Sequence, residues 1–273
     1  MNTLFLIILI IGLFLFILYF YDLCNYKEEK FESLKGDIPL IIHQTWKTKD
    51  VSLLNPNFKK GLESWKNLKN FEHKFYDDND CLNFISTYYN QYLNFYNSLK
   101  KGVEKADIFR YLIIHKYGGV YADIDTICVK DITPLLDKPM IVGIEYLPQF
   151  NKGVTQYNQW CFGSVPNNPM FIEIIETIIE RKKKLDFWGK NIILSMAGKP
   201  INDSEITFWL TGPYVFSTLI YKIPKESIHI YDRCILGSYD SSPECRNQGY
   251  IIHGFQGSWK NKWSEKKMKW KPN

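Results

Sequence analysis

Apolar and polar positions along the chain follow two periods, one typical of strands and one of helices. Short apolar or alternating runs predict strands at residues 40–43, 72–76, 120–125, 140–146, 160–165, 228–231 and 250–253. Apolar residues three or four positions apart predict helices at 55–69, 81–89, 101–117, 168–184 and 204–221. Strands that alternate with helices are typical of an α/β layered fold with a mostly parallel sheet. No repeat or linker divides this body, so we expect one domain.

The first apolar segment is longer than any of these strands. Residues 4–21 are uncharged and rich in Leu, Ile and Phe. As a helix this run is just long enough to cross a bilayer core of about 30 Å. No basic n-region or small-residue cleavage site accompanies it, which favours a retained signal-anchor over a cleaved signal peptide. We therefore divide the chain into an N-terminal tip (1–3), a transmembrane signal-anchor (4–21), a charged stem (22–37) and a globular domain (38–273).

The charges beside this segment bear on which side of the membrane carries the domain. Lys27, Lys30 and Lys35 follow the segment, whereas only the α-amino group precedes it. Basic residues are enriched on the cytoplasmic side of membrane segments. The flanking charges therefore favour a cytoplasmic domain.

Composition narrows the class of protein. Hydrophobic residues make up 45% of the 273 residues and charged residues 23%, as in ordinary globular proteins with a buried core. The net charge is +5, but the basic residues are mostly scattered Lys, whereas nucleic-acid binders cluster them and favour Arg. We expect no nucleic-acid partner. The six cysteines show no zinc-like spacing, and whether Cys234 and Cys245 pair across a loop in an oxidising compartment is left open.

Two carboxylates, Asp123 and Asp125, stand at the end of the strand expected at 120–125. Residues two apart on a strand share one face, and at its carboxyl end both side chains can reach one hard cation. Mn²⁺ and Mg²⁺ prefer such oxygen ligands, and α/β sheets bind ligands outside the carboxyl ends of their strands. The same triplet also fits a solvated acidic turn, so its surroundings must decide.

The helix that precedes this strand carries a charged pair. Asp107 and Arg110 are three positions apart, hence on one helix face. Gly118-Gly119 then ends the helix and leads into the strand. The pair fits a local ion pair or a polar pair that holds substrate hydroxyls beside a metal. Spacing alone leaves both interpretations open.

A resemblance to a known family begins at Asp107, in the run DIFRYLIIHKYGGVYADIDTICVKD. It is similar to the core of the D-x-D sugar transferases, glycosyltransferase family 32, which contains the yeast initiating α-1,6-mannosyltransferases and the inositol-phosphoceramide mannosyltransferases. Further matching pieces follow the family's order: IPLIIHQTWK at 38–47, WCFGSVPNNP at 160–169, LTGP at 210–213 and HGFQGSWK at 253–260. The resemblance implies a GT-A fold (a Rossmann-like nucleotide-sugar-binding domain), a nucleotide-sugar donor, Mn²⁺ or Mg²⁺, and retention of the donor's α configuration.

The resemblance also assigns roles to residues. Asp123, Asp125 and His253 would form the metal shell, although His253 also fits a satisfied core residue. The catalytic group would comprise Asp123 and Asp125 together with Asp107 and Arg110, which would contact the donor sugar and ribose. The full set expected to touch the donor is Thr45, Trp46, Asp107, Arg110, Gly119, Tyr121, Asp123, Ser258, Trp259 and Lys260. Trp46 fits a stack on the base or core packing.

The resulting prediction is a membrane-anchored retaining hexosyltransferase, with mannose from GDP-mannose as the first expectation for the donor and a glycan or glycolipid as the acceptor. The resemblance places the domain in the lumen of an ER- or Golgi-type membrane, against the flanking charges. The alternatives are an inactive membrane-tethered carbohydrate-binding module and a nucleotide-sugar hydrolase. Glu145, Asp203 and Glu205 are interpreted as surface acids and not as a nucleophile, which favours a front-face reaction.

Overall fold

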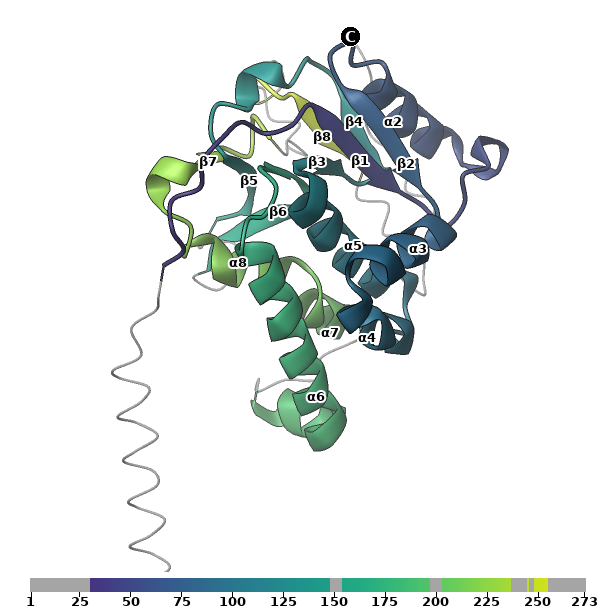
Figure 1. Cartoon of the computed structure of the whole chain (residues 1–273), viewed down its shortest axis with the longest axis vertical. Coiled ribbons are helices and arrows are strands. Elements are labelled where there is room, and N and C mark those ends of the chain that lie inside the picture. Colours follow the sequence, from purple (N-terminus) through teal and green to yellow (C-terminus); the bar gives the residue numbers. More distant parts are fainter. Residues whose placement is uncertain (1–29, 148–153, 197–202, 237–244, 246–247, 255–273) are drawn as a thin grey trace, which may run out of the picture. The chain divides into compact units, whose positions relative to one another are not determined.

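A six-stranded sheet forms the centre of the domain (Figure 1). The computed structural model describes residues 30–147, 154–196, 203–236, 245 and 248–254, without the side chains of 188–196. The strand order is β2-β1-β3-β6-β5-β7. The strands are β1 (Ile41–Thr45), β2 (Glu72–Tyr76), β3 (Gly119–Ala122), β5 (Met140–Tyr146), β6 (Gln156–Ser164) and β7 (Ile228–Tyr231). Only β6 among these six runs antiparallel to its neighbours, which confirms the predicted α/β fold with a mostly parallel sheet.

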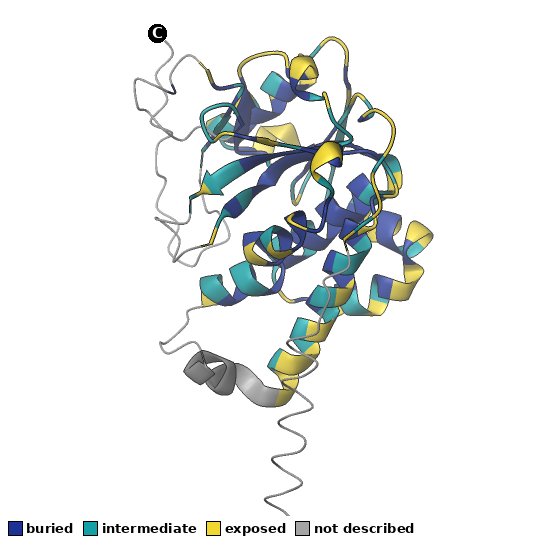
Figure 2. Cartoon of the chain, turned by 90° about the vertical axis from the view of Figure 1, so that its left-hand side faces the viewer, coloured by how far each residue is buried: buried dark blue, intermediate teal, exposed yellow. Residues whose placement is uncertain are grey.

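Helices cover both faces of this sheet (Figures 1 and 2). On one face lie helices that include α3 (Asp78–Tyr88), α5 (Gly102–Tyr117), α6 (Met170–Met196) and α8 (Pro213–Ile220). On the other face, α2 (Pro56–Lys66) contributes Trp65 to a second core. Tyr121 and Phe162 pack in the first core, whereas their neighbours Val120 and Cys161 pack in the second, as the side-chain alternation of strands requires.

A second, two-stranded sheet joins distant parts of the sequence. It pairs β4 (Thr126–Cys128) with β8 (Ile251–His253) in antiparallel orientation, and Thr126 stands opposite His253. The backbone N–H of Gly254 also donates to the carbonyl of Asp125 at 2.8 Å. This small sheet therefore sets the end of β8 beside the turn Asp123–Asp125 that precedes β4, called the acidic turn below.

Besides shifted ends, of which the early start of β6 and the late end of α6 are the largest, two predicted elements differ in kind from the structure. The strand expected at 120–125 ends at Ala122, and Asp123 to Asp125 form a turn before β4, because the backbone of Asp123 bonds back to Thr126. The helix expected at 204–221 is two helices, α7 (Asp203–Leu210) and α8, since Gly212 separates them and Pro213 begins the second. Pro at the first helical position is favourable because its missing N–H would have no partner there.

The glycine pair after α5 has the backbone that its sequence predicted. Gly118 has a φ of 64° and Gly119 a φ of 95°, values that side chains with a Cβ rarely adopt. A Cβ on Gly119 would also lie 2.5 Å from the carbonyl oxygen of Ile41. The glycines thus end α5 and let β3 pack tightly against β1.

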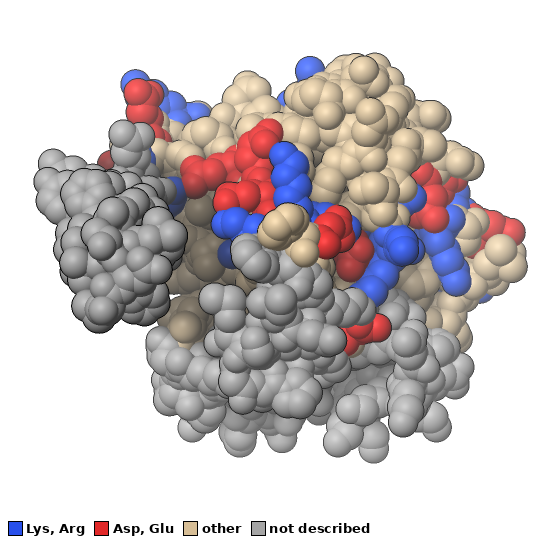
Figure 3. Space-filling view, turned by 90° about the horizontal axis from the view of Figure 1, so that it is seen from below, with Lys and Arg blue, Asp and Glu red and all other residues tan. Residues whose placement is uncertain are grey.

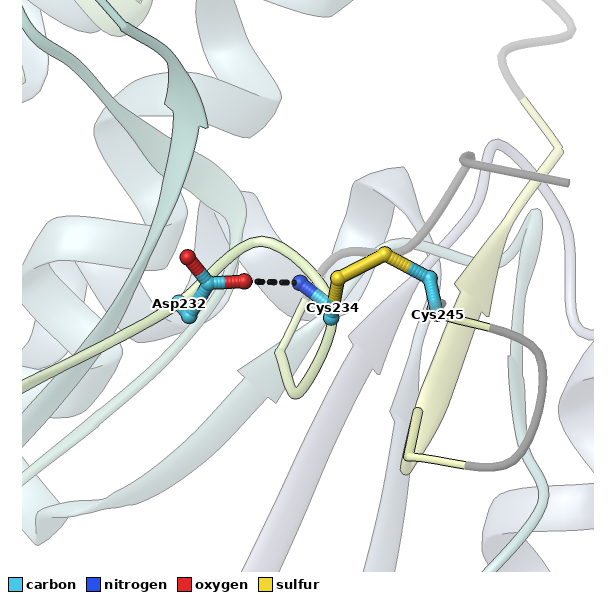
Figure 4. Close-up of a disulfide and its surroundings, with 3 residues drawn as sticks. All are labelled: Asp232, Cys234 and Cys245. Atoms are coloured by element: carbon cyan, nitrogen blue, oxygen red, sulfur yellow. Dashed lines mark hydrogen bonds between the residues drawn. A yellow bond between two sulfur atoms is a disulfide. The ribbon is translucent and has the colours of Figure 1, made fainter. Parts of the chain in front are cut away.

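A disulfide joins Cys234, after β7, to Cys245, before β8 (Figure 4). The carboxylate of Asp232 accepts from the backbone N–H of Cys234 at 2.8 Å in the same turn. The structure thus pairs Cys234 with Cys245, which the spacing of the cysteines had left open. The disulfide restrains the segment that leads into β8.

Residues from Phe31 onward form one compact unit, distinct from Met1–Lys30. Phe31 and Leu34, within the predicted stem, already pack against the cores of the domain. The transmembrane segment predicted at 4–21 lies outside the described residues. None of the helices that the structure describes is long and apolar enough to cross a membrane. On the face seen from below, basic and acidic side chains are interspersed (Figure 3).

Candidate active site

A cavity of about 770 Å³ opens at one edge of the main sheet. Its wall includes Thr45 at the end of β1, Asp123 just after β3 and Glu145 near the end of β5. These three strands run in the same direction, so their carboxyl ends meet at this edge. Helices α5, α7 and α8 supply the opposite wall. The cavity thus occupies the position at which α/β sheets bind ligands.

Asp123, Asp125 and His253 converge in this cavity. One ligand atom from each lies within 4.8 Å of the others, and His253 Nε2 is 3.2 Å from Asp125 Oδ1. The imidazole of His253 stacks on the indole of Trp160, with ring centroids 4.4 Å apart. Two carboxylates and one imidazole form a donor set that suits Mn²⁺. The three residues therefore fit the metal shell that the sequence predicted.

The acidic turn is held by its backbone. The N–H of Asp123 donates to the carbonyl of Trp160 at 2.8 Å, and the carbonyl of Asp123 accepts from the N–H of Thr126 at 3.0 Å. The Thr126 hydroxyl donates to the same carbonyl at 2.5 Å, and the indole N–H of Trp65 donates to that hydroxyl at 2.9 Å. Bonds of this kind fix the orientation of metal-binding side chains.

Behind the turn, Arg110 faces two carboxylates. Its Nη2 lies 2.9 Å from Asp107 Oδ1 and 3.3 Å from Asp123 Oδ1, and its guanidinium lies 4.6 Å from the ring centre of Tyr121. The Tyr121 hydroxyl also donates to Asp123 Oδ1 at 2.9 Å. Asp107 and Arg110 are only 2% and 4% exposed. The pair that spacing left ambiguous is therefore part of a buried network that reaches the acidic turn.

Burial and charge shift the pKa values of this group. Burial raises the pKa of Asp107 to about 7, although Arg110 and Thr211 oppose the rise. Burial likewise raises the pKa of Asp123, again against Arg110. Burial alone would lower the pKa of His253, but the nearby carboxylates, Asp125 foremost, outweigh it and raise the pKa. Among the Lys and Arg residues of the described lining, Arg110 is the one paired with Asp107 and Asp123, and one cation that faces two carboxylates favours a further bound cation.

The remaining predicted residues fall into three groups. Thr45 and Trp46 line the cavity, and Trp46 also packs edge-on against Phe58 with ring centroids 4.6 Å apart. Gly119 lies at the start of β3 against β1 and is outside the cavity lining. Ser258, Trp259 and Lys260 lie outside the described residues.

Several residues that complete the site have no role that the sequence predicts. Thr211 donates from Oγ1 to Asp107 Oδ2 at 2.6 Å, and the carbonyl of Gln159 accepts from Arg110 Nη1 at 3.0 Å. Trp160 and Thr211 lie within the matching pieces at 160–169 and 210–213, which was the available signal. The prediction that Glu145 is a surface acid is wrong. Its side chain is half-buried and lines the cavity, because β5 carries it to the edge of the sheet.

A known family model matches the part of the chain that carries most of this site. Residues 30–141 match the family model described as a glycosyltransferase sugar-binding region containing a DXD motif. The matched range contains Asp107, Arg110, Asp123 and Asp125. The predicted resemblance to the D-x-D sugar transferases is confirmed.

The relatives extend the likeness over more of the chain. Inositol phosphoceramide mannosyltransferase 3 of Schizosaccharomyces pombe is 35% identical over 42% of this chain and 32% of its own length. The initiation-specific α-1,6-mannosyltransferase of Candida albicans is 27% identical over 82% of this chain and 72% of its own length. The chain spans about a third of the length of the curated relatives that are at least 30% identical to it.

A solved structure shares the fold. The PaToxG glycosyltransferase superposes with a TM-score of 0.51 over 70% of this chain and 71% of its own, at 20% identity. At that identity the likeness concerns the fold alone. The mixed α/β sheet of this chain is therefore one that a glycosyltransferase also uses.

Proposed function

We propose that the protein is a metal-dependent retaining glycosyltransferase that moves a hexose from a nucleotide sugar to a glycan or glycolipid. The observation that carries this proposal is the convergence of Asp123, Asp125 and His253 at the carboxyl edge of the sheet, beside the buried Asp107–Arg110 pair. The names of the relatives support mannose as the hexose, with GDP-mannose as the first donor to test.

Each residue of the site has a task in this proposal. Asp125 and His253 would hold the metal most directly, because Asp123 Oδ1 already accepts from Arg110 and Tyr121. When bound, the metal would neutralise the diphosphate and stabilise it as a leaving group. Arg110 holds Asp107 and Asp123 in fixed positions, so that their carboxylates meet the donor without rearranging.

The nucleoside would occupy the β1 side of the cavity. Thr45 and Trp46 lie there, at the carboxyl end of a parallel strand as in other nucleotide-binding sheets. The rings of Trp46 and Phe58 pack at 66° to each other, a contact that restrains the indole beside the proposed base. Ser258, Trp259 and Lys260 are proposed to contact the diphosphate on the strength of the family resemblance.

The proposed reaction is a front-face displacement. In it the leaving phosphate takes the proton of the attacking hydroxyl while the bond from the anomeric carbon to that phosphate breaks. Such a reaction requires no enzyme nucleophile. Of the three carboxylates considered for a double displacement, Glu145 lines the cavity and Asp203 and Glu205 do not.

We propose a single-pass membrane anchor at residues 4–21 and a domain on the lumenal side. The Cys234–Cys245 disulfide supports that side, because such bonds persist in oxidising compartments. The charges after the anchor point the other way. A glycosylation acceptor introduced into an exposed loop of the domain distinguishes the two: its modification in cells supports the lumenal side, and exclusive labelling by cytosolic reagents contradicts it.

The function is tested with the purified full chain in detergent, incubated with Mn²⁺ and a panel of GDP and UDP sugars. We expect turnover of one donor, loss of that turnover with EDTA, and its return when Mn²⁺ is added. A mannoside acceptor should convert the slow release of free sugar into transfer. Release that no acceptor in a glycan panel suppresses would indicate a hydrolase, and absence of turnover and of donor binding would contradict the proposal.

A further inference from the structure

The cavity continues beyond the acidic turn to the end of β5. Glu145 and Tyr146 close β5 there, Gln156 begins β6 beside them, and Phe208 and Tyr214 face them from α7 and α8. In the sheet, β5 lies two strands from β3 on the side away from β1. Neighbouring strands are about 4.8 Å apart, which places the β5 end roughly 10 Å from the acidic turn. Since the proposed function puts the nucleoside at the β1 end, the β5 end is the part left for the second substrate.

This end of the cavity combines one polar pair with aromatic rings. Glu145 Oε2 accepts from Gln156 Nε2 at 2.7 Å. Tyr146 and Tyr214 are 44% and 40% exposed, and the ring of Tyr214 lies 6.2 Å from that of Phe208. A sugar presents hydroxyls around its rim and C–H groups on its faces. The polar pair suits the hydroxyls and the rings suit the faces.

Glu145 and Gln156 together are suited to bind hydroxyls in both directions. The Glu145 carboxylate accepts hydrogen bonds, and the amide of Gln156 beside it donates from its nitrogen and accepts at its oxygen. A sugar hydroxyl, which both donates and accepts, is complementary to this pair.

The charges at this end argue against an anionic ligand. Lys101 is the cation of the described lining that reaches α7, and its ammonium is already engaged. It donates to the carbonyl of Asp203 at 2.9 Å and to Thr207 Oγ1 at 2.8 Å, and it lies 3.6 Å from Glu104. A phosphate here would therefore be partly desolvated beside the Glu145 carboxyl, and the ammonium of Lys101 is not available to it, which is costly.

We propose that Glu145, Gln156, Tyr146 and Tyr214 form the acceptor subsite, and that it takes a neutral sugar residue of a glycan and not a phosphorylated lipid headgroup. The inference rests on the proposed transferase function and adds the second substrate to it. Phe208 extends the aromatic wall of this subsite.

The test compares acceptors and variants with the full chain in detergent and the donor that it turns over. Methyl α-mannoside is the neutral probe and inositol 1-phosphate the anionic one. Glu145→Gln and Tyr214→Ala should each raise the KM for methyl α-mannoside about tenfold or more, the loss of about 1.4 kcal/mol of binding, with a smaller change in the KM for the donor. Tyr221→Ala, a tyrosine of similar exposure (47%) outside the cavity lining, should change neither value.

A binding measurement keeps the inference separate from the transferase proposal. Ligand-observed NMR of methyl α-mannoside, with GDP and Mn²⁺ present, needs no turnover and should show binding that Tyr214→Ala abolishes. Transfer to inositol 1-phosphate but not to the mannoside, no mannoside binding by the wild-type chain, or equal KM values in wild type and both variants would overturn the acceptor assignment. Absence of donor turnover together with mannoside binding would contradict the transferase function alone.

Discussion

Arg110 is the residue on which the charge balance of the site depends. One guanidinium lies 2.9 Å from the buried Asp107 and 3.3 Å from the half-buried Asp123, and a single positive charge cannot neutralise both carboxylates. Burial therefore raises the pKa of Asp107 to about 7, above its value of about 3.9 in an unfolded chain. Ionised Asp107 consequently costs the folded protein free energy at neutral pH, even with Arg110 beside it.

This imbalance predicts how stability depends on pH. Between about pH 4 and pH 7 the folded state holds a proton on Asp107 that the unfolded chain has lost, so the free energy of unfolding falls as the pH rises through this window. From pH 5 to pH 8 the contribution of this group is a loss of about 2–3 kcal/mol. Denaturant titrations in EDTA should show that wild type loses more stability than Asp107→Asn by about this amount. Equal losses would show that Asp107 ionises normally in the fold.

Residue spacing revealed part of this network and missed the rest for a physical reason. Asp107 and Arg110 are one helical turn apart, so their meeting follows from helix geometry. Thr211, which donates to Asp107 at 2.6 Å, lies on the loop before α8, more than a hundred positions along the chain. Glu145 was taken for a surface acid because strand periodicity places a side chain on a face but does not say what covers that face.

At the scale of elements, α2 packs unusually close to the acidic turn. A Cβ added at Gly61 would lie 2.2 Å from the carbonyl oxygen of Ile124 and 2.8 Å from that of Thr126. Ile124 stands between Asp123 and Asp125 and packs in a small core with Phe58 and Leu62 of α2. The position of α2 therefore fixes the backbone from which both carboxylates project.

Gly61→Ala tests this contact. The added methyl group must displace backbone, so we expect a loss of about 1–3 kcal/mol of stability and weaker binding of Mn²⁺, measured by calorimetric titration under conditions in which the variant is folded. Glu63→Ala, at an exposed position of the same helix, should stay within about 0.5 kcal/mol of wild type and bind Mn²⁺ normally. A Gly61→Ala protein with wild-type Mn²⁺ affinity would show that α2 does not position the turn.

Most elements were predictable because each has an amphipathic or buried pattern of its own. The strands at β2, β5 and β7 have the predicted bounds, and α5 begins one residue later than expected. The errors lie where tertiary partners decide. The strand with the carboxylates ends at Ala122 because the next residue, Asp123, bonds to Trp160 of β6 and to Thr126, and neither partner is visible in the local pattern.

At the scale of the whole molecule, the segment before β1 belongs to the domain. The N–H of Phe31 donates to the carbonyl of Lys222 at 3.0 Å, and the N–H of Leu34 donates to Ser227 Oγ at 2.8 Å. Ser33 Oγ donates to Glu226 at 2.7 Å. Residues 31–34 therefore tie the start of the domain to the turn that precedes β7.

Truncation at two positions measures how much residues 31–37 contribute to the stability of the domain. A chain that begins at residue 30 should be more stable than one that begins at residue 38 by about 2–4 kcal/mol. The shorter chain loses the hydrogen bonds donated by the Phe31 and Leu34 N–H groups and by the Ser33 hydroxyl, and the burial of Phe31 and Leu34. Thermal and urea denaturation of the two purified proteins provides the comparison. Equal stabilities would show that residues 31–37 act only as a spacer.

The candidate metal site is assembled from residues that lie far apart in the sequence. His253 meets Asp125 because β8 pairs with β4 across more than a hundred residues, and the Cys234–Cys245 disulfide restrains the approach to β8. No spacing rule predicts that encounter, so the sequence pointed to His253 through family resemblance alone. The D-x-D pair, in contrast, was readable because both carboxylates are local.

The most direct test of the account is the effect of Mn²⁺ on the binding of a nucleoside diphosphate. Calorimetric titration of GDP and UDP into the full chain, with and without Mn²⁺, measures the free energy that couples the two ligands. We predict that Mn²⁺ tightens the binding of one diphosphate at least about tenfold, or about 1.4 kcal/mol, and that Asp125→Ala, shown to be folded, removes this gain. The same gain in Asp125→Ala would contradict a metal site built on Asp123, Asp125 and His253.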